Sequence, residues 1–272
     1  MIENSANVTE MLIGKVCCIV VEKKDRLNEI GYNNNGERMT IVRYGKYKDI
    51  DVQFDDGVIV EHRTYDEFLK GSIRNPMTPS VYGFGYFGVG EFKSCDENGK
   101  NTKCYMTWHD VHKRCYDSKY HEKKPTYKGC TVCKEWNNYQ EFAKWDNENY
   151  YEVGNERMML DKDILKKGNK VYSPENCVYV PQFINSLFTK SNKTRGNYPI
   201  GVTKDWNKFM ARLNKDNGKL ICLGTYDTPE EAFLAYKKAK EAYIKEVAEK
   251  YKGKIDNRAY EALMNYEVEI DD

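Results

Sequence analysis

The chain has 272 residues, of which 31% are charged and 13% aromatic, and its formal net charge is only +1. This length corresponds to two or three domains, and the balanced charge excludes a uniformly basic nucleic-acid-binding protein, so any such surface must be local. The mean hydropathy of −0.81 and the lack of a run of 18 apolar residues predict no membrane-spanning segment. Because Glu3 and Glu10 replace the positive charge of a secretory signal, we expect a cytoplasmic protein.

The cysteines do not suggest a disulfide framework, because nine of them, an odd number, are scattered along the chain. Cys130 and Cys133 form one Cys-x-x-Cys pair, which is half of a structural zinc signature. The two further ligands would have to come from cysteines and histidines elsewhere: Cys95, Cys104, Cys115, Cys177, His109, His112 and His121. Small buried cysteines are the simpler interpretation, and a structural Zn²⁺ is the less favoured one.

Residues 1–80 predict a small, strongly curved β domain of barrel type. A helical turn with Tyr65 and Phe68 follows its last strand and ends at Gly71. The basic side chains of this domain would suit nucleic acid, another protein is the second candidate partner, and a merely solvated basic surface is the simplest alternative. The predicted strands are residues 13–21, 39–44, 50–54 and 58–62.

A joint between domains is predicted next, because Pro76, Pro79 and four glycines lie within residues 76–90. Two helices are predicted after the joint from the helical spacing of large apolar side chains. The first includes Trp108 and Val111, and the second includes Tyr139 and Phe142. Both belong to a central domain, residues 81–195, in which Arg114 is a candidate phosphate contact.

The stretch 159–188, MLDKDILKKGNKVYSPENCVYVPQFINSLF, predicts a hairpin with an acidic pair, a loop and a short helix. Asp161 lies at the end of the first apolar run, Asn176 in the loop, and Asn185 on the apolar pattern of the helix. A carboxylate and an amide oxygen are suitable ligands for Mg²⁺ or Mn²⁺ beside a scissile phosphate. The alternative is that Asp161 and Asp163 are turn residues and Asn176 an ordinary cap.

These residues resemble the His-Asn-His nuclease family, in particular its phage and mobile-element branch related to homing endonucleases. The preceding segments YMTWHDVHKRCYD and YKGCTVCKEWNNYQEFAKW are similar to the same branch. The resemblance implies a ββα-metal fold in which Asp161 and Asn185 bind the metal and Asn176 braces the loop. Lys162 takes the place of the family's general-base histidine, and an unperturbed lysine is protonated near pH 7, so cutting requires a tuned Lys162 or Asp163 in its place.

Residues 196–252 predict a three-stranded sheet followed by one helix. Eight basic residues against two aspartates give residues 190–220 a charge of +6. Lys208 and Arg212 alternate with Phe209, Ala211 and Leu213, which predicts one cationic and one apolar face. The sequence Thr-Pro-Glu-Glu at residues 228–231 predicts a capped helix start. Residues 253–272 are predicted to be a mobile acidic tail.

The segments GVTK, KFMARL and GKLICLGTYDTPEEAFLAYKKA resemble the APETALA-type (ethylene-response-factor) DNA-binding domain. The resemblance implies that this sheet enters the major groove of double-stranded DNA. It carries DNA contacts over to Lys204, Lys208, Arg212 and Lys219, with Trp206 near the DNA backbone. A solvated basic face is the alternative.

The sequence therefore predicts an α+β multidomain protein that binds duplex DNA and is of phage or mobile-element origin. One hypothesis is metal-dependent nicking or cleavage at the hairpin. The second is a catalytically inactive DNA-binding or regulatory protein that retains the nuclease scaffold. The third is a phage protein that captures a host protein.

Overall fold

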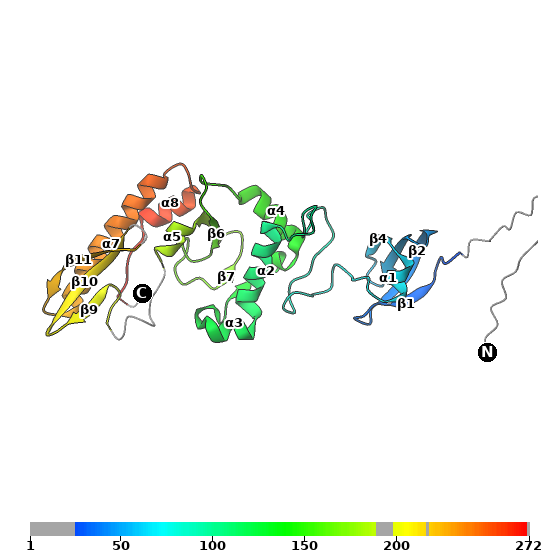
Figure 1. Cartoon of the computed structure of the whole chain (residues 1–272), viewed down its shortest axis with the longest axis horizontal. Helices are drawn as coiled ribbons and strands as arrows, with labels where there is room; N and C mark the ends of the chain where they lie inside the picture. Colours follow the sequence, from blue (N-terminus) through cyan, green and yellow to red (C-terminus); the bar gives the residue numbers. More distant parts are fainter. Residues whose placement is uncertain (1–24, 189–197, 216–217, 271–272) are drawn as a thin grey trace, which may run out of the picture. The chain divides into compact units, whose positions relative to one another are not determined.

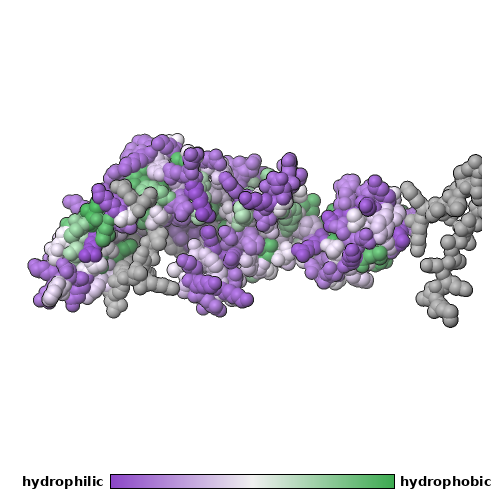
Figure 2. Space-filling model, in the orientation of Figure 1, coloured by the Kyte–Doolittle hydropathy of each residue, from purple (hydrophilic) through white to green (hydrophobic). Residues whose placement is uncertain are grey.

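The computed structural model describes residues 25–188, 198–215 and 218–270, and it is of the mixed α+β class (Figure 1). The chain divides into two compact units, Met1–Thr78 and Pro79–Asp272. Hydrophilic side chains cover most of the visible face of both (Figure 2). In the described part of the chain, no helix combines the length and apolar character needed to cross a membrane. The strand predicted at 13–21 lies outside the described residues.

The first unit is a four-stranded antiparallel sheet in the order β1-β2-β3-β4 with one short helix, α1 (Tyr65–Leu69). Strand alternation buries Met39, Ile41 and Val52 against Tyr65 and Phe68 of the helix. The three predicted strands within the described residues are confirmed, but among those residues the sheet stays open and does not form the predicted barrel. Helix α1 fills the curved side instead, and β1 and β4 remain edge strands. The strands are β1 (Ile30–Tyr32), β2 (Arg38–Lys46), β3 (Asp49–Phe54) and β4 (Ile59–Arg63).

The second unit begins with an aromatic core between two helices. Helices α2 (Lys103–Tyr116) and α4 (Tyr139–Asn149) confirm the two predicted helices. The indole nitrogen of Trp108 donates to the carbonyl oxygen of Trp136 at 2.7 Å, which satisfies the one polar atom of a fully buried ring. Between these helices lie short elements: α3 (Ser118–Lys123), η1 (Pro125–Tyr127), β5 (Thr131–Val132) and η2 (Glu135–Asn137).

The stretch 159–188 forms the predicted hairpin, loop and helix. Strands β6 (Met158–Asp161) and β8 (Val178–Pro181) pair antiparallel, and α5 (Gln182–Ser186) follows β8 directly. The loop between the two strands includes β7 (Val171–Tyr172), which pairs in parallel with β5. The loop is therefore anchored to the central helices rather than free.

The C-terminal sheet has the order β11-β10-β9, and its strands are β9 (Val202–Asp205), β10 (Lys208–Lys215) and β11 (Lys219–Tyr226). Helix α7 (Pro229–Tyr251) packs on one face of this sheet. The predicted capping box is confirmed, because Thr228 and Glu231 each bond the backbone nitrogen of the other.

The tail is not the mobile segment that was predicted for residues 253–272, because it contains helix α8 (Asn257–Met264), which packs on α7. Ile255, Ala259, Leu263 and Val268 recur at near-helical spacing and are all buried. The prediction of a mobile tail came from the acidic residues of this segment and left this apolar stripe out of account.

The predicted division at residue 196 does not separate two cores. Ile164, Val180 and Ile184 of the hairpin region share one hydrophobic cluster with Leu213 and Tyr243 of the sheet and its helix. The hairpin is too small to bury its own apolar side chains, so it completes its core against α7 and the sheet.

Candidate functional site

Asp161 ends strand β6 and caps the turn that follows. Its Oδ1 accepts the backbone N–H groups of Asp163 and Ile164, both at 2.7 Å. Burial raises the pKa of Asp161 above its usual value, and the two backbone donors oppose that shift. The carboxylate predicted to bind metal therefore has a structural role in this turn.

Lys162 is buried, with 6% of its surface exposed. Its Nζ donates to the two carboxylate oxygens of Asp163 at 2.8 and 2.7 Å, and to the carbonyl oxygen of Asn169 at 2.6 Å. Three oxygen acceptors thus surround the Lys162 ammonium group. In this arrangement its nitrogen is a hydrogen-bond donor and offers no lone pair that could take a proton from water. Asp163, the substitute base, is the partner of this ammonium group. Neither residue is arranged as a general base.

Asn169 braces the loop, a role that the sequence reading had assigned to Asn176. The Asn169 amide donates to the carbonyl oxygens of Lys162 at 3.0 Å and Val171 at 2.8 Å, and its Oδ1 accepts the Val171 N–H at 3.1 Å. Asn176 instead donates to Ser173 Oγ at 2.9 Å within a local turn. The Gly-Asn pair at 168–169 was the available signal, because glycine permits the positive φ of 72° found at Gly168.

Asn185 lies half-buried in α5. Asp161 pairs with Val178, whereas the chain enters α5 from Pro181, which pairs with Met158 at the other end of the hairpin. Among the described residues, no hydrogen bond joins Asp161 to Asn185. The chain therefore enters α5 at the end of the hairpin opposite Asp161.

The histidines considered as bases or ligands have other contacts. His112 is fully buried, its Nδ1 lies 3.0 Å from the carbonyl oxygen of Trp108, and burial lowers its pKa. His121 Nε2 lies 2.8 Å from the carbonyl oxygen of Arg114, and His109 packs on Tyr82.

Five of the cysteines lie in the central core or pack against it: Cys104, Cys115, Cys130, Cys133 and Cys177. Cys115, Cys130 and Cys177 are buried there, and burial raises the pKa of the Cys115 and Cys177 thiols to about 12. Within the described residues, neither Cys130 nor Cys133 belongs to a group of three side chains that could hold a metal. This arrangement corresponds to small buried hydrophobes.

One group with metal-ligand chemistry does occur in the described residues: Asp49, Asp51 and His62 of the first unit. Arg43 already neutralises both carboxylates, with its Nη2 2.8 Å from Asp49 and 2.6 Å from Asp51, and it lowers the pKa of both. His62 Nδ1 lies 2.9 Å from Asp49. A cation would have to displace the guanidinium, so this cluster is a satisfied ion-pair network.

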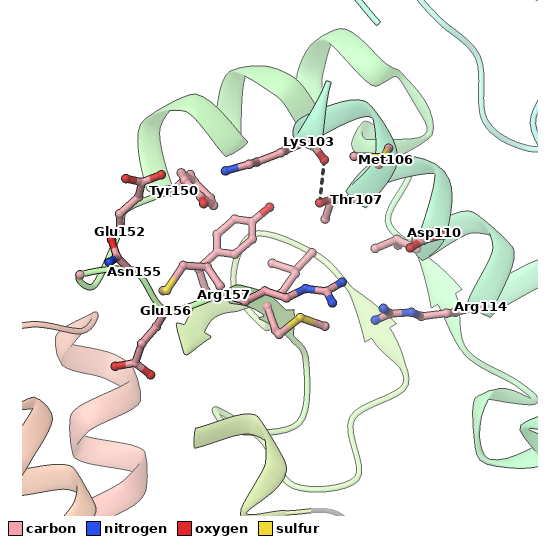
Figure 3. Close-up of a pocket in the computed structure, with 16 residues that line it drawn as sticks. Lys103, Met106, Thr107, Asp110, Arg114, Tyr150, Glu152, Asn155, Glu156 and Arg157 are labelled. Carbon is pink, nitrogen blue, oxygen red and sulfur yellow. Dashed lines mark hydrogen bonds between the residues drawn. The ribbon is translucent and has the colours of Figure 1, made fainter. Parts of the chain in front are cut away.

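Arg114 lines a cavity of about 650 Å³ between α2 and the segment that leads into β6 (Figure 3). Arg157, which the sequence reading missed, enters the same cavity from the other side, and the two guanidinium groups point toward one another. In the described part of the chain, neither has a carboxylate within ion-pairing distance. Arg114 is half-buried beside the ring of Tyr127, at 5.8 Å from its centroid.

The face of the C-terminal sheet opposite α7 carries Lys208 and Arg212. Ala211 and Leu213, which alternate with them, are buried against α7, so the predicted alternation is confirmed. Arg212 pairs with Cys222 across the sheet, and Lys208 forms an ion pair with Asp227 at 2.9 Å. The elements that pack extensively on β10 are the neighbouring strands β9 and β11 and helix α7.

Lys204 and Lys219 do not share that face, although they were expected to. Lys204 pairs with Phe209, which packs toward the core, and Lys219 pairs with Lys215, whose Nζ contacts Glu246 of α7. Paired residues of an antiparallel sheet point to the same side. Both lysines are exposed and lie on the two edge strands, so they flank the sheet rather than line its free face.

Trp206 is the most exposed large apolar side chain in the described residues, at 91%. It lies in the turn between β9 and β10 with a positive φ of 52°, which is uncommon for a bulky residue. The resemblance to the APETALA-type domain implied a position near the DNA backbone but not this exposure.

Comparisons with protein-family models, with curated proteins and with solved structures find no match to this chain.

Proposed function

We propose that this protein binds duplex DNA through the uncovered face of β9–β11, and that its ββα hairpin is a scaffold that does not cut. The observation that carries the proposal is a single-layered sheet with Arg212 and Lys208 on its free face and Lys204 and Lys219 on its two edges. The resemblance of the two segments to phage homing endonucleases and APETALA-type domains supports the same reading.

The dimensions of the sheet suit the major groove. Three strands are about 10 Å across, from a spacing of about 4.8 Å between strands, and the major groove of B-DNA is about 12 Å wide. The guanidinium of Arg212 would then face base edges, where Arg binds guanine through two hydrogen bonds. The edge lysines would face the phosphates on either wall of the groove, which position a protein without reading sequence.

The hairpin supports binding without hydrolysis. A one-metal nuclease needs a base with a free lone pair beside the metal. Lys162 donates to Asp163 and Asn169, and Asp161 accepts two backbone N–H groups, so these side chains stabilise the loop. The alternative, metal-dependent nicking by Asp161 and Asn185, requires this loop to rearrange.

The test has two measurements on the full chain. Fluorescence anisotropy with a duplex library should show saturable binding, and Arg212→Ala should weaken it about 10-fold or more, from the loss of a bidentate contact. Lys238→Ala, which removes an exposed charge from α7, is the matched control and should not change the affinity. Equal affinities of the two variants would contradict the proposed interface.

The second measurement incubates supercoiled plasmid with Mg²⁺ or Mn²⁺. The proposal expects the plasmid to stay supercoiled at protein concentrations that saturate binding. Nicking that Asp161→Ala and Asn185→Ala both abolish would overturn the non-cutting scaffold and establish the nuclease.

A further inference from the structure

We propose that the cavity between α2 and the segment before β6 binds a nucleoside monophosphate group, with Arg114 and Arg157 holding the phosphate. This site is separate from the DNA-binding sheet and does not depend on it. It also lies outside the predicted metal ligands, Asp161 and Asn185, neither of which lines the cavity.

The two guanidinium groups define the phosphate position. They extend from opposite walls and point toward one another, although like charges repel (Figure 3). In the described residues neither is neutralised by a carboxylate at ion-pair distance. An anion between them would remove the repulsion and accept hydrogen bonds from both, since the fork of a guanidinium matches two oxygens of one phosphate.

The rest of the cavity suits a flat, partly apolar group. Its volume of about 650 Å³ lies in the usual range for small-molecule sites. Tyr150 packs edge-on against Tyr179 at 5.2 Å between ring centroids, and both line the cavity together with Met158. Aromatic rings of this kind stack on nucleobases with little sequence preference.

The acidic side chains of the cavity favour a ligand with hydrogen-bond donors over a simple anion. Glu156 is turned toward α7, where it accepts the hydroxyl of Tyr251 at 2.9 and 3.0 Å. Asp110 lies on α2 one helical turn before Arg114 and faces the cavity. It repels phosphate but accepts a hydrogen bond from a sugar hydroxyl or a base amine, so it favours a nucleotide over inorganic phosphate.

The experiment titrates the full chain by calorimetry with thymidine 5′-monophosphate, inorganic phosphate and thymidine. The monophosphate should bind, inorganic phosphate more weakly, and thymidine without phosphate weakest. Arg157→Ala should weaken monophosphate binding at least 10-fold; Arg157 is exposed, so the fold should tolerate the change. Arg74→Ala, which removes an exposed arginine from the first unit, is the control and should bind as the wild type does.

Asp110→Asn should change the affinity for phosphate in the direction opposite to that of Arg157→Ala. Removing the negative charge should tighten the binding of inorganic phosphate by a few fold, whereas purely structural roles for Asp110 and for Arg157 would not give opposite effects on phosphate binding. The site is overturned if the wild-type chain shows no saturable monophosphate binding, or if Arg157→Ala binds it as tightly as Arg74→Ala does.

Two sources of the ligand are separated with duplexes that differ only in a 5′-phosphate. A phosphate-dependent gain in affinity that Arg157→Ala removes assigns the cavity to the terminal nucleotide of a strand. Monophosphate binding without such a gain assigns it to a free mononucleotide.

Discussion

The ammonium group of Lys162 lies 2.7 Å from a carboxylate oxygen of Asp163, the residue next to it in the chain, and it also donates a hydrogen bond to the carbonyl oxygen of Asn169. A buried cation with three oxygen acceptors stabilises the loop as long as all three are present. Lys162, at the position that would hold a general base in a nuclease, therefore stabilises the loop through these hydrogen bonds.

Replacing Lys162 with Ala should lower the free energy of unfolding by about 1–3 kcal/mol, because the carbonyl of Asn169 loses a charged donor in a buried position. Lys166→Ala, an exposed lysine four residues on, should change it by less than about 0.5 kcal/mol. Urea unfolding followed by tryptophan fluorescence measures both. Equal free energies of unfolding for the two variants would show that the hydrogen bonds of Lys162 do not stabilise the fold.

Asn169 and Asn176 should differ in the same assay. Asn169→Ala leaves the buried carbonyl oxygen of Lys162 and the part-buried carbonyl oxygen and N–H of Val171 without this partner, so the expected loss is about 2–4 kcal/mol. Asn176→Ala removes one contact to Ser173 in a half-exposed turn, and about 0.5–1 kcal/mol is expected. The reverse order would restore Asn176 as the brace of the loop.

The edge lysines and the face arginine should differ in how salt affects their variants. Lys204→Ala and Lys219→Ala should weaken binding to all duplexes alike and reduce the slope of log K against log salt by about 0.9 each, because one phosphate contact is lost. Arg212→Ala should in addition relax sequence preference at one position. Anisotropy between 50 and 300 mM salt, on a preferred and a scrambled duplex, measures both; unchanged slopes for the lysine variants would remove them from the interface.

Divalent cations should have no role in binding. The Asp161 carboxylate is engaged by two backbone N–H groups, and Arg43 occupies the only Asp-Asp-His group of the described residues. EDTA should therefore leave both the DNA affinity and the melting temperature unchanged at constant ionic strength. An increase in melting temperature with Mn²⁺ that Asp161→Ala abolishes would instead reveal a metal at the hairpin.

Acid should destabilise the second unit through His112. Burial lowers the folded-state pKa of His112 below its ordinary 6.5, so the unfolded chain binds the extra proton first. The stability from a neutral His112 is complete above about pH 6.5 and is lost as the pH falls from there toward the folded pKa. His112→Gln should flatten the fall in unfolding free energy between pH 7 and 5; a wild-type slope in His112→Gln would contradict this assignment.

The sequence determined the local elements wherever one signal dominated. The Thr228 and Glu231 capping box and the alternation of Lys208 to Leu213 depend on residues close in the chain, and both appear as predicted. The hairpin of β6 and β8 followed by α5 was also foreseeable from spacing alone.

Only the tertiary structure decided how those elements share cores and which polar atoms meet. The apolar stripe of α8 was hidden among acidic residues, and the edge placement of Lys204 and Lys219 depends on the register of strand pairing. A one-residue difference in register reverses the side of the sheet that a side chain faces. Arg114 and Arg157 face one another across the cavity although they are 43 residues apart in the sequence. The ammonium group of Lys162 donates to the carbonyl oxygen of Asn169 on the other side of the loop. Contacts of this kind depend on tertiary packing, which composition and periodicity do not specify.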